Sequence, residues 1–316
     1  RIGARRAAAM SDPLLVTGLH RSGTTWAGRM LCLSGEAGYI HEPFNPARRP
    51  SWSGGRIPFW FQYICAENEN EFEPILQDVL EFRYPLLANL RDPRTYKRVG
   101  ILAREYPGAY MSRLRHLRPL LKDPMALFSA EWLAHRFGAR VVVMIRHPAA
   151  FAGSIKRLNW QFKFRSWLAQ DLLLRDWLRP YEERMREYST HDVDIIDQAV
   201  LMYQVMLSVI DRYRDAHPSW IFVRHEDLAE SPVEGFRDLY DRLGLTWSAE
   251  VERSVARYSG SSNPTEPAAW RHGSVKRNSR GAAATWRQRL TAGEINRIKE
   301  GVSGAAGFYS DADWAT

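Results

Sequence analysis

Hydrophobic residues along this chain fall into short runs that are separated by amphipathic segments. Two runs, Leu14–Leu19 and Arg140–Ile145, are dominated by apolar and β-branched residues, which is typical of buried parallel strands. Ala37–Ile40 and Trp220–Val223 predict two further strands. Apolar residues at helical spacing predict helices over the following segments: Thr24 to about Ser34, Ala126–Phe137, Pro148–Leu158, Ser166–Tyr188, Asp194–Ala216, Val233–Leu243 and Ala292–Ser303.

Strands and helices alternate over the whole length, without an internal repeat or a domain-scale linker. This alternation predicts an α/β fold with three αβα layers and a mostly parallel central sheet, formed by one domain over residues 11–316. Residues 1–10 are predicted to be a disordered arm. We expect a loop with a short helix over 51–65 and a loop over 259–284, whereas residues 66–116 show no clear period. Ligands of such sheets bind at the carboxyl ends of the strands, which directs attention to the residues that follow each run.

Composition narrows the classes of partner. Apolar residues make up 45% of the 316 residues, and the formal net charge of +8 suits an anionic ligand. The basic residues are scattered and no RNP-type or zinc motif occurs, so nucleic acid is not an expected partner. No apolar run approaches the ~20 residues that span a bilayer, so stable membrane insertion is not expected. Two cysteines favour a reducing, cytoplasmic location, and no feature indicates an oligomeric state.

The first predicted strand is followed by the loop His20–Trp26. Counted from Gly18, it reads G-x-x-x-x-G-T-T, close to the phosphate-binding loop G-x-x-x-x-G-K-[ST]. Gly23 permits tight curvature, and backbone N–H groups at the following helix N-terminus present donors to a phosphate. Thr24 stands where that loop has its lysine, so Arg21 supplies the cation instead. Further donors are the hydroxyls of Ser22, Thr24 and Thr25.

The run Arg140–Ile145 ends in Arg146, where metal-dependent nucleotide hydrolases carry an Asp for Mg²⁺. An arginine cannot ligate a metal, but it suits a bidentate contact with an anion, so we predict no metal site. An ion pair with a helix carboxylate is the structural alternative for Arg146. Ser154 follows two helical turns later. A phosphate loop without a metal-binding Asp disfavours the alternative function, a P-loop kinase or NTPase.

These residues resemble the PAPS-dependent sulfotransferase family, where PAPS is 3′-phosphoadenosine 5′-phosphosulfate. The family's [KR]-S-G-T-T-W loop matches Arg21–Trp26 and implies a site for the 5′-phosphosulfate, with Trp26 near the adenine or in the core. Arg146 and Ser154 match its 3′-phosphate site. His225 stands in the place of a tyrosine that approaches the adenine. A second 3′-phosphate clamp is implied by Ser279, Arg280 and Gly281, where Ser279 replaces a cation that Lys276 or Arg277 can supply.

The resemblance also bears on the catalytic base. The family's small-molecule enzymes carry a histidine base two residues after a lysine, but Pro124 occupies that position here. The segment Lys122-Asp123-Pro124 is instead similar to the tyrosylprotein enzymes, whose base is a glutamate, and this implies Glu42. Lys122 and Arg21 would stabilise charge on the transferring group. His41 is the rival base, because its ordinary pKa suits proton transfer at neutral pH.

The sequence therefore predicts in-line transfer of a sulfuryl group from PAPS to an acceptor hydroxyl, with PAP (the 3′,5′-bisphosphate) as product. Aromatic side chains are frequent in Pro50–Cys65 and between Trp160 and Tyr188, where they form either core or the walls of an acceptor site. Such walls suit a carbohydrate, a glycolipid or a secondary metabolite.

Overall fold

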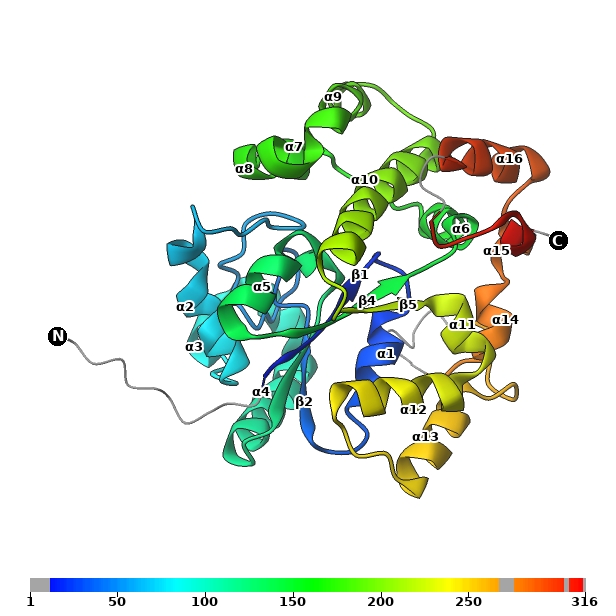
Figure 1. The fold of residues 1–316 in the computed structure, drawn as a ribbon. Helices are drawn as coiled ribbons and strands as arrows, with labels where there is room; N and C mark the ends of the chain where they lie inside the picture. The colour runs from blue at the N-terminus through cyan, green and yellow to red at the C-terminus, as the bar shows by residue number, and fades with distance from the viewer. Residues whose placement is uncertain (1–11, 267–275, 304–306, 315–316) are drawn as a thin grey trace.

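A five-stranded parallel sheet runs through the middle of the molecule, with helices on both faces (Figure 1). The computed structural model describes residues 12–266, 276–303 and 307–314. The strand order is β2-β3-β1-β4-β5, and all four neighbouring pairs are parallel. The strands are β1 (Leu14–Gly18), β2 (Ala37–His41), β3 (Arg118–Lys122), β4 (Arg140–Ile145) and β5 (Ile221–Arg224). The predicted three-layer αβα fold with a parallel sheet is confirmed. The predicted arm, residues 1–10, lies outside the described residues.

Strand β1 is the centre of the sheet, and all five of its residues are buried. Side chains of a strand alternate between its two faces, and here Leu15 and Leu14 belong to two different core clusters. The cluster on one face includes residues of helices α5 (Ala130–Phe137), α6 (Pro148–Leu158) and α10 (Ile195–Ala216). The other includes residues of α1 (Thr24–Leu31), α12 (Pro232–Leu243) and α13 (Ala249–Ser259). Both faces of the sheet are thereby removed from water.

Gly18 ends β1 where the backbone comes closest to its neighbour β4. A Cβ atom at Gly18 would lie 2.1 Å from the Met144 carbonyl oxygen, and the residue has a φ of +120°. The next N–H, that of Leu19, donates to the same carbonyl at 3.0 Å. The chain therefore turns directly from the strand into the loop that leads to α1.

Several elements differ from the sequence predictions. Strand β3 was not predicted, because only Leu120 and Leu121 are apolar in its five residues. Residues 51–65, all of them described, contain no helix, contrary to the short one expected there. Residues 66–116, which had no clear period, are mostly helical. They form α2 (Glu69–Leu80), α3 (Leu86–Arg91), the 3₁₀ segment Pro93–Arg98 and α4 (Val99–Leu114).

The continuous helix predicted over Ser166–Tyr188 is wrong. The chain instead forms short pieces: α7 (Arg165–Leu168), α8 (Asp171–Leu173), a π turn over Leu174–Leu178, a 3₁₀ turn over Arg179–Tyr181, and α9 (Glu182–Thr190). Gln170 is extended between the first two, and its side-chain oxygen accepts the N–H of Tyr63 at 2.8 Å. Pro180, which lacks an N–H, lies in the 3₁₀ turn. A tertiary contact and a proline thus outweigh the helical period.

The remaining elements complete the face of the molecule near the strand ends. They are the 3₁₀ segment Pro124–Ser129, α11 (His225–Glu230), α14 (Ser279–Ala283), α15 (Trp286–Arg289), α16 (Ala292–Gly301) and a 3₁₀ turn over Asp311–Trp314. Among the described helices, none is both long and apolar enough to cross a bilayer.

Candidate active site

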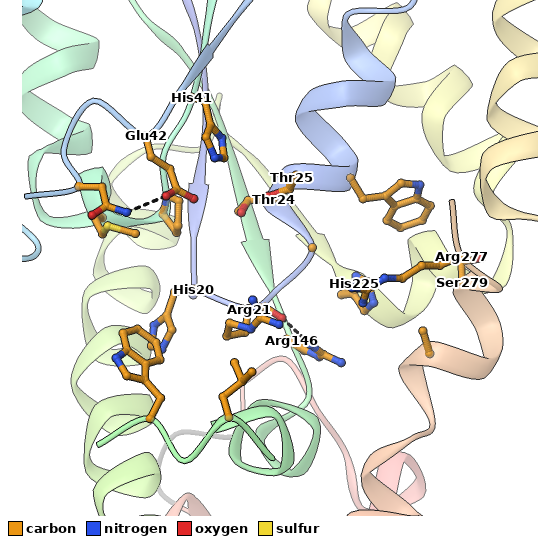
Figure 2. A pocket seen from close by; sticks show the side chains of 18 of the residues that line it. His20, Arg21, Thr24, Thr25, His41, Glu42, Arg146, His225, Arg277 and Ser279 are labelled. Atoms are coloured by element: carbon orange, nitrogen blue, oxygen red, sulfur yellow. Dashed lines mark hydrogen bonds between the residues drawn. The ribbon is translucent and has the colours of Figure 1, made fainter. Parts of the chain in front are cut away.

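A cavity of about 490 Å³ opens at the carboxyl ends of the strands. Its wall comes from the loop after β1, the residues after β2, β3 and β4, the start of α11, and the segment around α14. Figure 2 shows Arg21, Thr24 and Thr25 in the middle of this cavity, with His41 and Glu42 on one side and His225, Arg277 and Ser279 on the other. The predicted donor and base residues therefore share one cavity, apart from those noted below.

The loop after β1 turns through two residues with positive φ, Arg21 at +67° and Gly23 at +87°. Thr24 and Thr25 begin α1 and line the cavity. Ser22 does not line it, because its side chain is fully buried and its hydroxyl donates to the Leu19 carbonyl. Of the three predicted hydroxyls, two therefore reach the cavity, and the third holds the turn closed.

Gly23 lies directly against His225. A Cβ atom at Gly23 would lie 2.5 Å from the Nδ1 atom of His225, so the imidazole fits only beside a glycine. Trp26 packs edge-on against His225 and Phe236, with ring centroids 5.7 and 5.1 Å apart, and it also lines the cavity. Trp26 thus contributes to both the core and the site. Burial lowers the pKa of His225 to about 3, which keeps its ring neutral at pH 7.

Two arginines from neighbouring strands meet at the floor of the cavity. Arg146, directly after β4, donates to the backbone carbonyl of Arg21, while its Nε atom is buried without a partner among the described residues. The Nε of Arg21 donates to the Ser154 hydroxyl at 3.2 Å. Ser154 does not line the cavity, so its effect is to orient Arg21. Burial and mutual repulsion of cations lower the pKa of Arg21 to about 10, which leaves it charged at pH 7.

The predicted clamp near the C-terminal end is only partly at the cavity. Arg277 and Ser279 line it. Arg280 does not: its exposed side chain forms an ion pair with Glu230 at 2.6 Å and donates to the Glu230 carbonyl. Gly281 is absent from the lining as well, and its N–H donates to the Asn278 side chain at the start of α14. Among the described residues of this segment, Arg277 is thus the cation that lines the cavity.

Glu42 comes directly after β2, with a φ of +51°. Its backbone N–H donates to the Lys122 carbonyl at 3.0 Å, which continues the register of β2 and β3. Its carboxylate forms an ion pair with the Lys122 ammonium and accepts a hydrogen bond from the Asn45 amide at 2.9 Å. Burial alone would raise the pKa of Glu42, but Lys122, His41 and Asn45 outweigh it and lower the pKa to about 2. Glu42 is thus ionised at neutral pH.

Lys122 lies behind Glu42 rather than at the cavity wall, since only 1% of its side chain is exposed. Burial lowers the pKa of this lysine, and the Glu42 carboxylate opposes that effect. The neighbouring Asp123 is fully buried and accepts the N–H groups of Phe44 and Met125 at 2.6 and 2.9 Å. Burial, together with repulsion from Glu42, raises the pKa of Asp123 to about 7. Asp123 thereby fixes the turn that carries Glu42.

His41 lines the same side of the cavity as Glu42. Its Nδ1 atom shares a hydrogen bond of 3.3 Å with the Tyr39 hydroxyl. Burial and the nearby Lys122 ammonium hold the pKa of His41 well below its ordinary value, so its ring is neutral at pH 7. Both rival bases therefore reach the cavity in a form that accepts a proton.

Comparison with known proteins places these residues in a family. The model of the family described as "Sulfotransferase family" matches residues 13–249, which include β1 through β5. The chain belongs to the sulfotransferase family. Human carbohydrate sulfotransferase 5 is 28% identical over 204 residues, which cover 61% of this chain and 42% of that protein. Mouse carbohydrate sulfotransferase 2 is 35% identical over 89 residues, 26% of this chain and 16% of that protein. The chain thus matches less than half the length of these relatives.

Two solved sulfotransferase structures are also similar. One is the sulfotransferase domain from the curacin biosynthetic pathway, with a TM-score of 0.49 and 13% identity over 96% of this chain and 99% of that one. The other is sulfotransferase STF1 from Mycobacterium tuberculosis, with a TM-score of 0.45 and 18% identity over 94% of this chain and 77% of that one.

This sulfotransferase also has a cavity residue that sequence analysis did not single out, His20. Both of its ring nitrogens are buried without a hydrogen-bond partner in the described part of the chain. Aromatic rings surround it, with centroids 4.4 Å away at Trp160, 4.9 Å at Phe151 and 5.8 Å at Phe61. Burial lowers the pKa of His20 to about 3. His20 could have been found from the sequence, because it is a polar residue directly after the predicted buried strand Leu14–Leu19.

The cavity wall contains further residues that were not singled out from the sequence: Asn45, Met125, Leu158 and Ala282. Trp60 and Trp160 also line it, and they belong to the two aromatic segments predicted to form either core or the walls of an acceptor site. The ring centroids of Trp60 and Trp160 lie 6.2 Å apart, although 100 positions separate the two residues in the sequence. No local motif could therefore reveal that they meet. Within residues 12–266, 276–303 and 307–314, no group of three His, Cys, Asp or Glu side chains is placed to hold a metal ion.

Proposed function

We propose that this chain is a PAPS-dependent sulfotransferase that transfers a sulfuryl group to an acceptor hydroxyl, with Glu42 as the general base. The observation that carries the proposal is the pairing, across one cavity, of two arginines, of which Arg146 is buried, with an ionised carboxylate. Arg21 and Arg146 lie on the floor, and Glu42 lies at the side. Membership in the sulfotransferase family supports the same reaction.

The donor side of the cavity fits a polyanion such as PAPS. Besides burial, repulsion from Arg146 and Arg277 lowers the pKa of Arg21, and repulsion from Arg289 and Arg277 lowers that of Arg146, so a bound anion would relieve unfavourable charge. The buried Nε of Arg146 and Nδ1 of His225 have no partner in the described residues, and buried polar groups of this kind are rare unless a ligand or water satisfies them. We propose that these residues, with the backbone from Gly23 to Thr25, hold PAPS.

Bound PAPS supplies an electrophilic sulfuryl group and leaves as PAP. Glu42 accepts the proton that the acceptor hydroxyl loses as its oxygen bonds to sulfur. With a pKa near 2, Glu42 is a weak base, so it takes the proton only as the hydroxyl becomes more acidic during transfer. Lys122 holds the carboxylate in place, and Arg21 stabilises negative charge that develops on the donor side.

The acceptor side suits a ring-bearing, polyhydroxylated molecule. Trp60 and Trp160 provide flat apolar surfaces, while the neutral ring of His20 offers one donor and one acceptor to a hydroxyl. We propose a carbohydrate, a glycolipid or a secondary metabolite as acceptor, and the names of the carbohydrate sulfotransferase relatives favour the first. We also propose that residues 11–316 form one domain, because both core clusters share one sheet.

Two measurements test this function. Calorimetry of the wild type with PAP and with ATP–Mg²⁺ should show clear preference for PAP, and Arg146→Ala should weaken PAP binding by roughly 10- to 100-fold, because a buried charged hydrogen-bond donor is lost. Incubation with labelled PAPS and a panel of sugars, glycolipids and phenols should then label an acceptor. Preference for ATP–Mg²⁺, or unchanged PAP affinity in Arg146→Ala, would contradict the proposed donor site.

A further inference from the structure

Helix α4 has two sides that are both largely apolar. One side faces inward through Leu102 and Ala109, which are buried. The other side faces solvent. Its residues are spaced three or four positions apart along the chain, and this spacing places them in one stripe along the helix. This exposed stripe consists of Val99, Ala103, Tyr106, Tyr110 and Leu114.

The stripe is part of a larger concentration of exposed apolar side chains. Of the nine large hydrophobic residues that are exposed in the described part of the chain, eight lie between positions 87 and 114. The ninth, Leu158, is at the cavity. Tyr96 and Leu87 are each 67% exposed, and Leu114 is 60% exposed. We call this surface the α3–α4 face; its apolar members are Leu87, Leu90, Tyr96, Val99, Tyr106, Tyr110, Met111 and Leu114.

The charges of the α3–α4 face have one sign. Exposed arginines occur along the same segment, and none of the following forms an ion pair within the described residues: Arg91, Arg98, Arg104, Arg113 and Arg115. The acidic residues of the same segment are turned inward. Asp92 pairs with Arg49 at 2.7 Å as well as with Arg94, and Glu105, only 8% exposed, pairs with Arg48. The outward surface is therefore both basic and apolar.

We propose that the α3–α4 face binds the surface of an anionic phospholipid bilayer. Apolar and tyrosine side chains would enter the boundary between headgroups and acyl chains, while the arginines meet the anionic headgroups. A second copy of this chain would bring like charges together, and nucleic acid would leave Leu87, Val99 and Leu114 exposed to water. An anionic bilayer satisfies both the charge and the apolar surface.

The position of this face fixes how the molecule would lie on the bilayer. The ion pairs Arg48–Glu105 and Arg49–Asp92 join α4 and the segment before it to the loop that follows Glu42. Binding through the face would therefore hold the cavity at a constant orientation to the bilayer. The inference does not depend on the reaction that takes place in the cavity.

Vesicle co-sedimentation tests the proposal. The wild type should bind vesicles that contain phosphatidylglycerol, bind pure phosphatidylcholine much less, and dissociate as salt is raised. Arg104→Glu/Arg113→Glu should weaken binding by more than roughly 10-fold, since each basic residue near an anionic surface is worth roughly fivefold in affinity. Tyr110→Ser/Leu114→Ser should weaken it by roughly 10-fold or more through lost apolar burial.

Arg253→Glu is the matched control, because this exposed arginine lies on α13 and not on the α3–α4 face. It should bind vesicles like the wild type, and thermal unfolding should show that all variants are folded. Equal binding to neutral and anionic vesicles, or wild-type binding by both double variants, would overturn the proposal. Self-association that Tyr110→Ser/Leu114→Ser abolishes, without vesicle binding, would assign the face to a second copy instead.

Discussion

The two sides of the cavity differ in how the fold brings their residues together. On the donor side, Arg21 and Arg146 follow β1 and β4, which are neighbours in the sheet, so their proximity follows from the strand order. On the acceptor side, Trp60 and Trp160 come from loops that no strand pairing relates. Local motifs therefore predict the residues of the proposed donor side, whereas the proposed acceptor side depends on the packing of distant segments.

The two sides also differ in their charge. The proposed donor side gathers cations that repel one another, and this arrangement would favour a bound anion. On the acceptor side, the Glu42 carboxylate is compensated by Lys122, and the rings of His20 and His41 are neutral at pH 7. The charges on that side compensate one another without a ligand, and this suits the binding of an uncharged acceptor. Substitutions on the two sides should therefore have separable effects.

The largest expected effect is on turnover, from Glu42→Gln. Loss of the general base should reduce kcat by roughly 100- to 10,000-fold. PAP affinity, measured by calorimetry, should stay within about twofold of the wild type, because Glu42 lies on the acceptor side.

His41→Gln is the matched variant, since it removes the rival base and retains a hydrogen-bonding group for Tyr39. It should keep most of the activity. Near-normal turnover in Glu42→Gln together with inactivity in His41→Gln would transfer the role of base to His41.

An intermediate effect is expected on donor binding, from Arg277→Ala. This cation lines the cavity, so its loss should weaken PAP binding by roughly 5- to 20-fold. Arg280→Ala provides the comparison, because Arg280 is exposed and paired with Glu230, and PAP affinity should change by less than about twofold. The reverse order of effects, measured by calorimetry, would return the clamp to Arg280.

The smallest expected effect is on the pH dependence of stability, from His225→Gln. The ordinary pKa of histidine is 6.5 and that of His225 is about 3, so between these values the unfolded chain binds a proton that the folded chain does not. The free energy of unfolding therefore falls as pH decreases through this window, by up to ~1.4 kcal/mol per pH unit for this group. Denaturant unfolding at pH 4 to 6 should give a shallower slope for His225→Gln. Identical slopes would show that His225 titrates normally in the folded protein.

The sequence predicted those strands and helices whose hydrophobic pattern is clear over a few consecutive residues. The runs at Leu14–Leu19 and Arg140–Ile145 became β1 and β4, and the helix over Pro148–Leu158 has the predicted bounds. Strand β3 was hidden because its few residues include Arg118, Pro119 and Lys122. Its absence from the prediction also concealed that Lys122 lies beside Glu42, since that contact follows from the pairing of β2 with β3.

The proposed roles of the site residues depend on a different kind of information. Sequence spacing could not show that the Ser22 hydroxyl turns toward Leu19 or that Arg280 points out to solvent, because both depend on side-chain contacts with distant or buried backbone. Nor could it show that His20 lies among aromatic rings from three segments. Residue type predicted what chemistry is available, and packing decided which residues face the cavity.

The left-handed backbone at Arg21 has a consequence for the heat resistance of the chain. A residue other than glycine pays roughly 1 to 2 kcal/mol for that conformation, and here the side chain also faces other cations. Selection for thermal stability alone would therefore favour glycine at this position and discard the guanidinium. An arginine kept there would lower the melting temperature in return for the proposed anion site, and stabilising substitutions elsewhere in the chain could offset that loss.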